Sequence, residues 1–298
     1  MKRSGSGQGS DQHRQATLDP LVLERCRDLV GLLFPWDINR ALELALLKTF
    51  CLPSISGLLH QTGEFEQRPR KRYDDTALIV AELVRLGPDT PQGQAVIQRL
   101  NRIHGTYTIR QSDYAYVLSG FVAEPIRWIE RYGWRALTTL EQESLFLFWD
   151  YVGHLMHLEQ RPDNLSELME LNQRANAEMF SYSDSNQMVA DATVRMLLGP
   201  WPAPLHPWLR SIVRSLLEPD TLKSLNWPSA PAWQTQALRA ALHCRSRILF
   251  ILRRVWLPKR RRFFSERATV SYGKHFTLEQ IGPPSLLPRL NSFTRKGS

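Results

Sequence analysis

Apolar side chains recur every three to four residues along most of this 298-residue chain, and stretches that alternate apolar with polar residues are rare. The first spacing places apolar side chains on one face of an α-helix, whereas alternation would indicate a half-buried strand. We therefore predict an all-α fold, with a single globular domain of roughly ten helices and ends that are disordered or wrap the surface. The expected helices span residues 18–34, 38–50, 74–87, 91–109, 112–133, 138–158, 164–180, 185–199, 208–217 and 232–257.

The two ends of the chain differ in composition from the helical part. Residues 1–17 are polar and contain no apolar run, so we expect a disordered tail rather than a signal peptide. The folded domain is taken as residues 18–257, and residues 258–298 as a basic extension packed partly on it. Within the domain, a Pro-Ser-Gly turn is expected at 53–57 and a kink or break at Pro125.

The net charge of +9 belongs to one end of the chain. Residues 253–298 contain eleven Lys or Arg and two Asp or Glu, whereas the rest of the chain carries equal numbers of both signs. A neutral body gives no reason to expect nucleic-acid binding. We expect the cluster at residues 259–262 (KRRR) to lie on the surface, where it is available for peripheral contact with an anionic membrane.

Cysteine usage and hydropathy both favour a cytoplasmic protein. The three cysteines are scattered and form no CxxC pair, which argues against a disulfide framework or a structural zinc site. The most apolar stretch, residues 41–59, contains Glu43, Lys48 and Pro53, although a membrane-spanning helix needs about 20 largely apolar residues.

The segment RLNRIHGTY (99–107) places a histidine on an apolar helix face. His104 lies four residues after Leu100 and three before Tyr107, so the three side chains share one face. Periodicity alone favours a neutral core histidine bonded to a carbonyl, with a catalytic base or a metal ligand as alternatives. Gly105 indicates a bulky group close to the backbone, because glycine costs about 1 kcal/mol inside a helix.

Arg72 and Thr76 lie one turn apart in KRYDDTALIVAEL (71–83), on the same face as the apolar residues Ile79 and Leu83. An arginine on an inward-facing stripe is costly to bury unless it meets an anion or a polar ligand. Asp75 offers a simpler explanation, a local ion pair with Arg72 that needs no ligand. The sequence leaves both interpretations open.

Other metal and nucleotide patterns are weak or missing. His154 and His157 form an HxxH pair, but the sequence contains no HExxH or ExxH that would complete a zinc or di-iron site. We expect these two histidines to be structural or near the helix surface. Nucleophile-elbow, phosphate-loop and paired Rossmann-glycine motifs do not occur.

Five motifs follow one another along the chain: KRYDDT (71–76), RLNRIHG (99–105), DYAYVLSGFVAEPIRW (113–128), LTTLEQESLFLFWDYVGHLM (137–156) and SYGKHFTLEQIGPP (271–284). Each motif is modest alone, but their order and spacing together resemble the MpaB oxygenase family over about residues 20–285. That family is similar in its catalytic domain to the bacterial latex-clearing proteins, the rubber oxygenases. The resemblance implies an all-α catalytic domain over residues 18–257.

The resemblance also implies a cofactor and a site. In the latex-clearing branch a histidine of a core helix holds the iron of haem b, and His104 matches it as metal ligand. Arg72 and Thr76 match the arginine and threonine of the RxxxT motif, as catalytic residues. Arg72, Arg99 and Arg102 become candidates for the haem propionates, and Gly105 leaves room for the flat macrocycle. The implied enzyme is an oxidoreductase that uses dioxygen on a small or prenyl-type apolar substrate.

The sequence departs from the family pattern at two points. Asp75 stands where some latex-clearing enzymes carry a lysine that ligates the iron. Their base glutamate has no clear equivalent among His60, Glu64 and Glu66. The sequence also shows no secretion signal of the kind those enzymes carry, so we expect a cytoplasmic haem oxygenase and not an extracellular rubber-degrading enzyme. The alternative is a non-enzymatic helical protein that binds haem or a partner, and whose basic C-terminal end docks a partner or a membrane surface.

Overall fold

Thirteen α-helices make up most of residues 17–255 and 260–287, the part of the chain described by this computed structural model. Within these residues there is no β-strand, only an isolated bridge between Thr269 and Gly273. The prediction of an all-α, single globular domain is confirmed. The tail predicted at 1–17 lies almost entirely outside the described residues. The helices are α1 (Pro20–Asp28), α2 (Pro35–Thr49), α3 (Pro53–Thr62), α4 (Glu64–Gln67), α5 (Pro69–Leu86), α6 (Pro91–His104), α7 (Gln111–Tyr132), α8 (Thr139–Leu155), α9 (Leu165–Met179), α10 (Asp184–Leu198), α11 (His206–Ser215), α12 (Pro219–Ser224) and α13 (Ala232–Val255).

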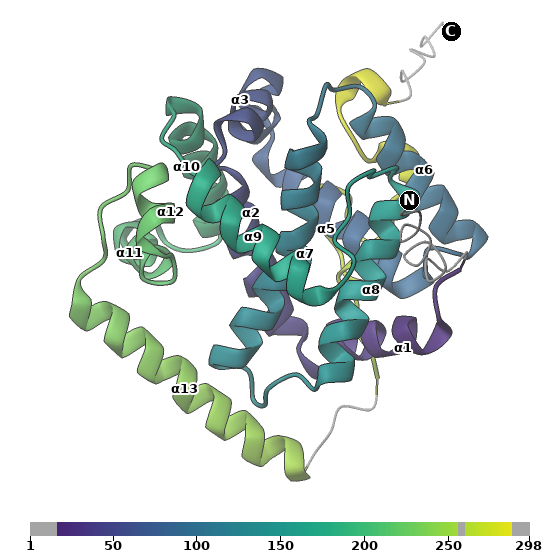
Figure 1. Cartoon of the computed structure of the whole chain (residues 1–298). Helices are drawn as coiled ribbons and strands as arrows, with labels where there is room; N and C mark the ends of the chain where they lie inside the picture. The colour runs from purple at the N-terminus through teal and green to yellow at the C-terminus, as the bar shows by residue number, and fades with distance from the viewer. Residues whose placement is uncertain (1–16, 256–259, 288–298) are drawn as a thin grey trace, which may run out of the picture.

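Helix α7 lies at the centre of the bundle, where it packs against α2, α8 and α9 (Figure 1). Val122 and Ile129 of α7 are fully buried in the main hydrophobic core. The helix runs through Pro125 and does not break there. Packing on three neighbouring helices outweighs the roughly 3 kcal/mol that a proline inside a helix costs.

Six of the described α-helices begin with a proline. Proline suits the first helical position, because its fixed φ matches the helix and its missing N–H would have no partner there. Pro53 begins α3, so the turn predicted at 53–57 is wrong. Pro69 begins α5, and this helix therefore starts before the predicted residue 74. The structure has more helices than the roughly ten that the sequence predicts, because the short helices α3, α4 and α12 were not expected.

Helix α6 ends at His104, although the sequence predicts a helix over 91–109. Gly105 is the C-cap, and the next residues fold into a turn. The Thr106 hydroxyl donates to the Ile103 carbonyl (2.7 Å), and the Tyr107 N–H donates to the His104 carbonyl (3.0 Å). His104 therefore occupies the last turn of α6 and not its middle.

The C-terminal segment 260–287, yellow in Figure 1, packs against α5 and α6. Asp74 of α5 accepts hydrogen bonds from the Ser271 N–H (3.1 Å) and hydroxyl (2.7 Å), 197 residues later in the chain. Asp75 accepts bonds from the Tyr272 hydroxyl and from the Gly282 N–H (3.1 Å). The two adjacent carboxylates of KRYDDT thus hold the motif SYGKHFTLEQIGPP in place.

The basic cluster at 259–262 is only partly available at the surface. Arg261 forms ion pairs with Glu24 (2.8 Å) and Asp28 (2.7 Å) on α1. Lys259 lies outside the described residues. The expectation that the whole cluster faces solvent therefore needs correction at Arg261, which ties the C-terminal segment to α1.

Truncation of the chain before Ser271 is expected to lower the melting temperature strongly, whereas removal of residues 289–298 should be tolerated. The longer truncation removes the groups that bond Asp74 and Asp75, and each buried carboxylate left short of partners costs about 1–3 kcal/mol. Thermal unfolding followed by circular dichroism measures the difference. A chain that ends at residue 270 and melts like the full chain contradicts this role of the segment.

No single helix within the described residues is both long enough and apolar enough to span a membrane. Helices α2 and α3 meet the length and composition requirement only together, as a pair bent by 94°. Leu47 of α2 and Ile55 of α3 are buried in the protein core.

Candidate functional site

Helices α5 and α6 bring Arg72, Thr76 and His104 to one place in the fold. Arg72 and Thr76 lie one turn apart on α5, and Arg72 Nη1 donates a hydrogen bond to Thr76 Oγ1. His104, the last residue of α6, lies close enough for the Arg72 charge to lower its pKa. Three residues that the sequence predicts as one site are therefore neighbours in the structure.

His104 is a neutral imidazole at neutral pH. Burial, and secondly the positive charge of Arg72, lower its pKa to about 4. Its Nδ1 atom is enclosed and has no hydrogen-bond partner among the described residues. The Tyr114 ring packs edge-on against the imidazole, with the ring centres 5.3 Å apart. A core histidine bonded to a carbonyl through Nδ1 is therefore not what the structure contains, and the unpaired nitrogen fits an added ligand.

Arg72 does not pair with Asp75, so that interpretation of the sequence is wrong. The Asp75 carboxylate is taken up by Lys71 Nζ (2.8 Å), the Gly282 N–H (3.1 Å) and the Tyr272 hydroxyl. No carboxylate among the described residues forms an ion pair with Arg72, which lies instead over the Phe65 ring at 5.3 Å.

The Arg72 side chain is half-buried and its guanidinium forms no ion pair among the described residues, although the charges of Asp75 and Glu64 are near enough to affect its pKa. Burial lowers the pKa of Arg72, but a guanidinium remains protonated in proteins. Its charge disfavours protonation of His104 and favours an anion beside it. A carboxylate such as a haem propionate has the chemistry that this position lacks.

Thr76 holds Arg72 in position. Its hydroxyl accepts the bond from Arg72 Nη1 and donates to the Arg72 backbone carbonyl (3.2 Å). Both hydrogen-bonding functions of the hydroxyl are used within this turn of α5. Donation from Thr76 to a bound ligand would need a rotation of this hydroxyl.

A recess of about 440 Å³ opens next to this site. Glu64 and Tyr107 line it, and both are near enough to Arg72 to affect its pKa. Glu64 accepts a bond from Arg68. His60 and Glu66, by contrast, form an exposed pair with each other (2.6 Å). Of the three residues considered as a base, Glu64 is the one whose charge reaches Arg72.

The three remaining cofactor candidates stay predictions, and their surroundings differ from what the sequence suggests. Arg99 is buried and donates to the carbonyls of Ile281 (2.8 Å) and Glu279 (2.9 Å), so it already braces the C-terminal segment. Arg102 is exposed. Gly105 is exposed too, and a Cβ there would meet only carbonyl oxygens of its own helix, the nearer at 3.2 Å.

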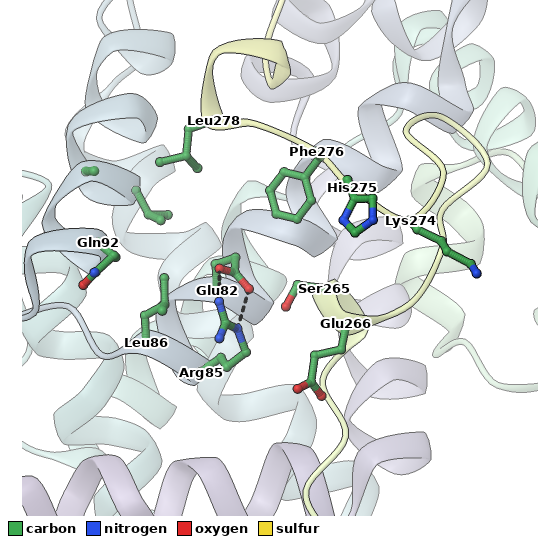
Figure 2. A pocket seen from close by; sticks show the side chains of 12 residues that line it. Glu82, Arg85, Leu86, Gln92, Ser265, Glu266, Lys274, His275, Phe276 and Leu278 are labelled. Carbon is green, nitrogen blue, oxygen red and sulfur yellow. Dashed lines mark hydrogen bonds and ion pairs between the residues drawn. The ribbon is translucent and has the colours of Figure 1, made fainter.

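A second recess, of about 470 Å³, lies between α5, α6 and the C-terminal segment (Figure 2). At the base of the recess, Arg85 points toward Glu82 and donates two hydrogen bonds to it, of 2.7 and 2.6 Å. His275 and Phe276 line its other side. None of the predicted site residues borders this recess.

His154 and His157 are both exposed at the end of α8, in agreement with the expectation that they lie near the helix surface. Within residues 17–255 and 260–287, no group of three His, Cys, Asp or Glu side chains is arranged to hold a metal ion.

Residues 40–246 match the family described as "ER-bound oxygenase mpaB/B'/Rubber oxygenase, catalytic domain". The matched region is more than half of the chain and contains Arg72, Thr76 and His104. The chain belongs to this MpaB/rubber oxygenase family. The stretch after residue 246, which includes SYGKHFTLEQIGPP, lies beyond the matched region.

Three fungal members of the MpaB/rubber oxygenase family are similar to this chain. ER-bound oxygenase mpaB' of Penicillium brevicompactum is 26% identical over 226 residues, which cover 70% of this chain and 53% of the relative. ER-bound oxygenase mpaB of the same organism is 28% identical, over 61% of this chain and 51% of the relative. The protein of that name from Penicillium roqueforti is 27% identical, over 61% and 67%. The chain thus spans about half the length of the first two relatives.

Sequence analysis missed three residues that shape the site in this family member. Tyr114 packs on His104, and Tyr272 and Lys71 occupy the carboxylate of Asp75. All three lie inside the motifs that carry the family resemblance, so a signal was present. The motifs did not reveal what these residues do. The contacts of Tyr114 and Tyr272 join different elements, and the contact of Lys71 depends on the side-chain orientations on α5.

The stability of this MpaB/rubber oxygenase family member without haem is expected to fall as the pH drops from about 6.5 to about 4. In this window His104 is protonated in the unfolded chain but not in the folded one, so acid favours unfolding. The shift corresponds to a free energy of unfolding on the order of 3 kcal/mol. Urea unfolding at several pH values measures it, and His104→Gln should remove this part of the pH dependence. An equal pH dependence in both proteins contradicts the buried neutral imidazole.

Proposed function

We propose that this chain is a haem-dependent oxygenase that uses dioxygen on a small or prenyl-type apolar substrate. Family membership supports an oxygenase, and the site supports the cofactor. The observation that carries the proposal is the proximity of two groups: neutral His104, whose enclosed Nδ1 has no partner among the described residues, and Arg72, which forms no ion pair with them. A histidine nitrogen is a common protein ligand of haem iron, and a guanidinium is a suitable partner for a haem carboxylate.

Each residue of the site has a defined part in this proposal. A bound haem would supply the iron centre at which dioxygen reacts. His104 would provide the nitrogen that ligates the iron, and its low pKa keeps that nitrogen unprotonated across the physiological range. Tyr114 fixes the ring orientation by edge contact. Arg72, oriented by Thr76, neutralises a carboxylate of the cofactor or polarises the bound oxidant.

The absorption spectrum of the purified protein tests the proposal. We expect a Soret band, in the protein as isolated or after addition of haem, that shifts on reduction and again with carbon monoxide. The alternative, a helical interaction protein without haem, predicts a colourless protein that takes up no haem. A haem protein that consumes no dioxygen with any apolar prenyl compound would instead indicate a binding protein.

The names of the relatives place those proteins at the endoplasmic reticulum. By analogy, association with a membrane surface is proposed here as well. The cytoplasmic location expected from cysteine usage and hydropathy remains a prediction.

A further inference from the structure

Helix α13 presents an apolar stripe to solvent. Ile248, Ile251, Leu252 and Val255 follow the spacing i, i+3, i+4, i+7 and so share one face of the helix. Their exposed fractions are 52%, 63%, 55% and 87%. Trp233, 67% exposed, lies at the other end of α13. Figure 1 shows α13 along one edge of the molecule, with no other helix on its outer side.

The side of α13 that adjoins the stripe is fastened to the body, so the stripe cannot turn inward. Arg245 forms two bonds with Asp37 (2.9 and 3.1 Å) and stacks over the Trp36 ring at 3.9 Å. Ser246 donates to the Gly133 carbonyl (2.6 Å). Leu242 is buried on the same side. The helix therefore has two apolar faces, of which the fold covers one.

The charges beside the stripe are all positive. Helix α13 contains five arginines and no Asp or Glu. Arg245 is engaged with the body, whereas Arg247 and Arg254 are exposed and lie seven residues apart, on one flank of the stripe. An exposed apolar stripe flanked by arginines is typical of helices that lie in the interfacial region of an anionic bilayer.

We propose that the outer face of α13 is a membrane-docking surface: Ile248, Ile251, Leu252 and Val255 enter the headgroup region of an anionic bilayer while Arg247 and Arg254 contact lipid phosphates. A second copy of the chain fits this face poorly, because pairing two such faces would bring arginines together with no acid on α13 to compensate them. Residues 1–16 and 288–298 contain few apolar residues, whereas residues 256–259 (WLPK), which directly follow the stripe, add Trp256 and Leu257 to the apolar composition of this end of the chain. The stripe lies beyond the region that matches the family, residues 40–246.

Vesicle co-sedimentation of the full chain tests the proposal, with phosphatidylcholine vesicles that contain about a third phosphatidylserine. We expect binding that weakens with salt, because exposed charges are screened over about 8 Å at physiological ionic strength. Ile251→Ser with Leu252→Ser should weaken it by about tenfold or more, and Arg247→Gln with Arg254→Gln should remove most of its salt dependence. Leu140→Ser, at a leucine of α8 that is 61% exposed, is the control for the first pair. Arg174→Gln with Arg195→Gln, at exposed arginines of α9 and α10, is the control for the second.

The outcomes distinguish a bilayer from a second copy of the chain as the partner of α13, and they test this proposal separately from the haem proposal. Vesicle binding that the α13 variants leave unchanged overturns the assignment, and so does equal binding to vesicles of phosphatidylcholine alone. A chain that binds no vesicles but changes from dimer to monomer in Ile251→Ser with Leu252→Ser identifies a second copy as the occupant. The haem spectrum should be the same in all four variants, since none of these residues borders His104; failure of the haem proposal therefore leaves this test unaffected.

Discussion

Replacement of His104 by alanine is expected to abolish stable haem binding while the helical content stays close to that of the unmodified protein. Among the described residues, His104 is the histidine whose pKa the Arg72 charge lowers. Its Nδ1 atom makes no hydrogen bond with these residues that the substitution would remove. Removal of the ring from the end of α6 leaves the capping turn intact, because Thr106 and Gly105 close that turn through backbone carbonyls. Haem stoichiometry after reconstitution, measured by absorption, reports the effect.

His154→Ala is the matched control, since His154 also lies at a helix end but is exposed. It should keep full haem binding. Added imidazole should restore a Soret band in His104→Ala, because the variant leaves a space where the ring was. Unchanged haem stoichiometry in His104→Ala would rule out the ligand assignment.

Arg72→Ala is expected to give the second largest effect, a loss of haem affinity without a comparable loss of stability in the haem-free protein. When a buried ion pair loses one partner, the charge that remains costs about 3–5 kcal/mol. Removal of the Arg72 guanidinium would leave a cofactor carboxylate as such an unpaired charge. Without haem the situation differs, because Arg72 forms no ion pair with a described residue that the substitution would break. The free energy of unfolding should therefore fall much less than the free energy of haem binding.

Two measurements make this expectation specific to Arg72. Arg85→Ala, on the same helix, should leave haem affinity unchanged, because Arg85 is paired with Glu82 away from the site. Titration of His104 by NMR in the haem-free protein should show a higher pKa in Arg72→Ala, since the Arg72 charge lowers it. Equal losses of haem affinity in both variants, with no change at His104, would assign Arg72 a structural role only.

Helical periodicity was enough to predict the fold class and most of the long helices, because their apolar stripes face one core. The start of α8 is also legible locally, since Thr138 and Glu141 fit the Thr-x-x-Glu pattern of the capping box that the structure contains. Proline was misleading as a local signal, because it occurs both in turns and at the first position of helices. Pro53 was taken as part of a turn, although a proline that breaks one helix also suits the first position of the next.

The proximity of Arg72, Thr76 and His104 was predictable, but the partners of these residues were not. Arg72, Thr76 and His104 share inward-facing positions that spacing alone reveals. The partner of a given carboxylate depends partly on residues far away in the chain. Asp75 forms an ion pair with Lys71 of its own helix and accepts hydrogen bonds from Tyr272 and Gly282 of the C-terminal segment. The local rule that pairs Arg72 with Asp75 failed for that reason.

The outer stripe of α13 could not be recognised from the sequence because the helix has apolar residues on two sides. Projected on a helical wheel, the buried and exposed sets are mixed with arginines and give no single apolar face. The stripe became evident only when the contacts of Arg245 and Ser246 showed which side the body covers.

The bonds between α5 and the C-terminal segment also constrain the order in which the protein can be completed during translation. Asp74 and Asp75 leave the ribosome early, but Ser271, Tyr272 and Gly282 follow only after all thirteen α-helices have been synthesised. Until then the helix that carries Arg72 and Thr76 lacks its outer support. Insertion of a cofactor would therefore be a late event in biogenesis, and nascent chains that stall before Ser271 would be expected to remain substrates for chaperones and proteases.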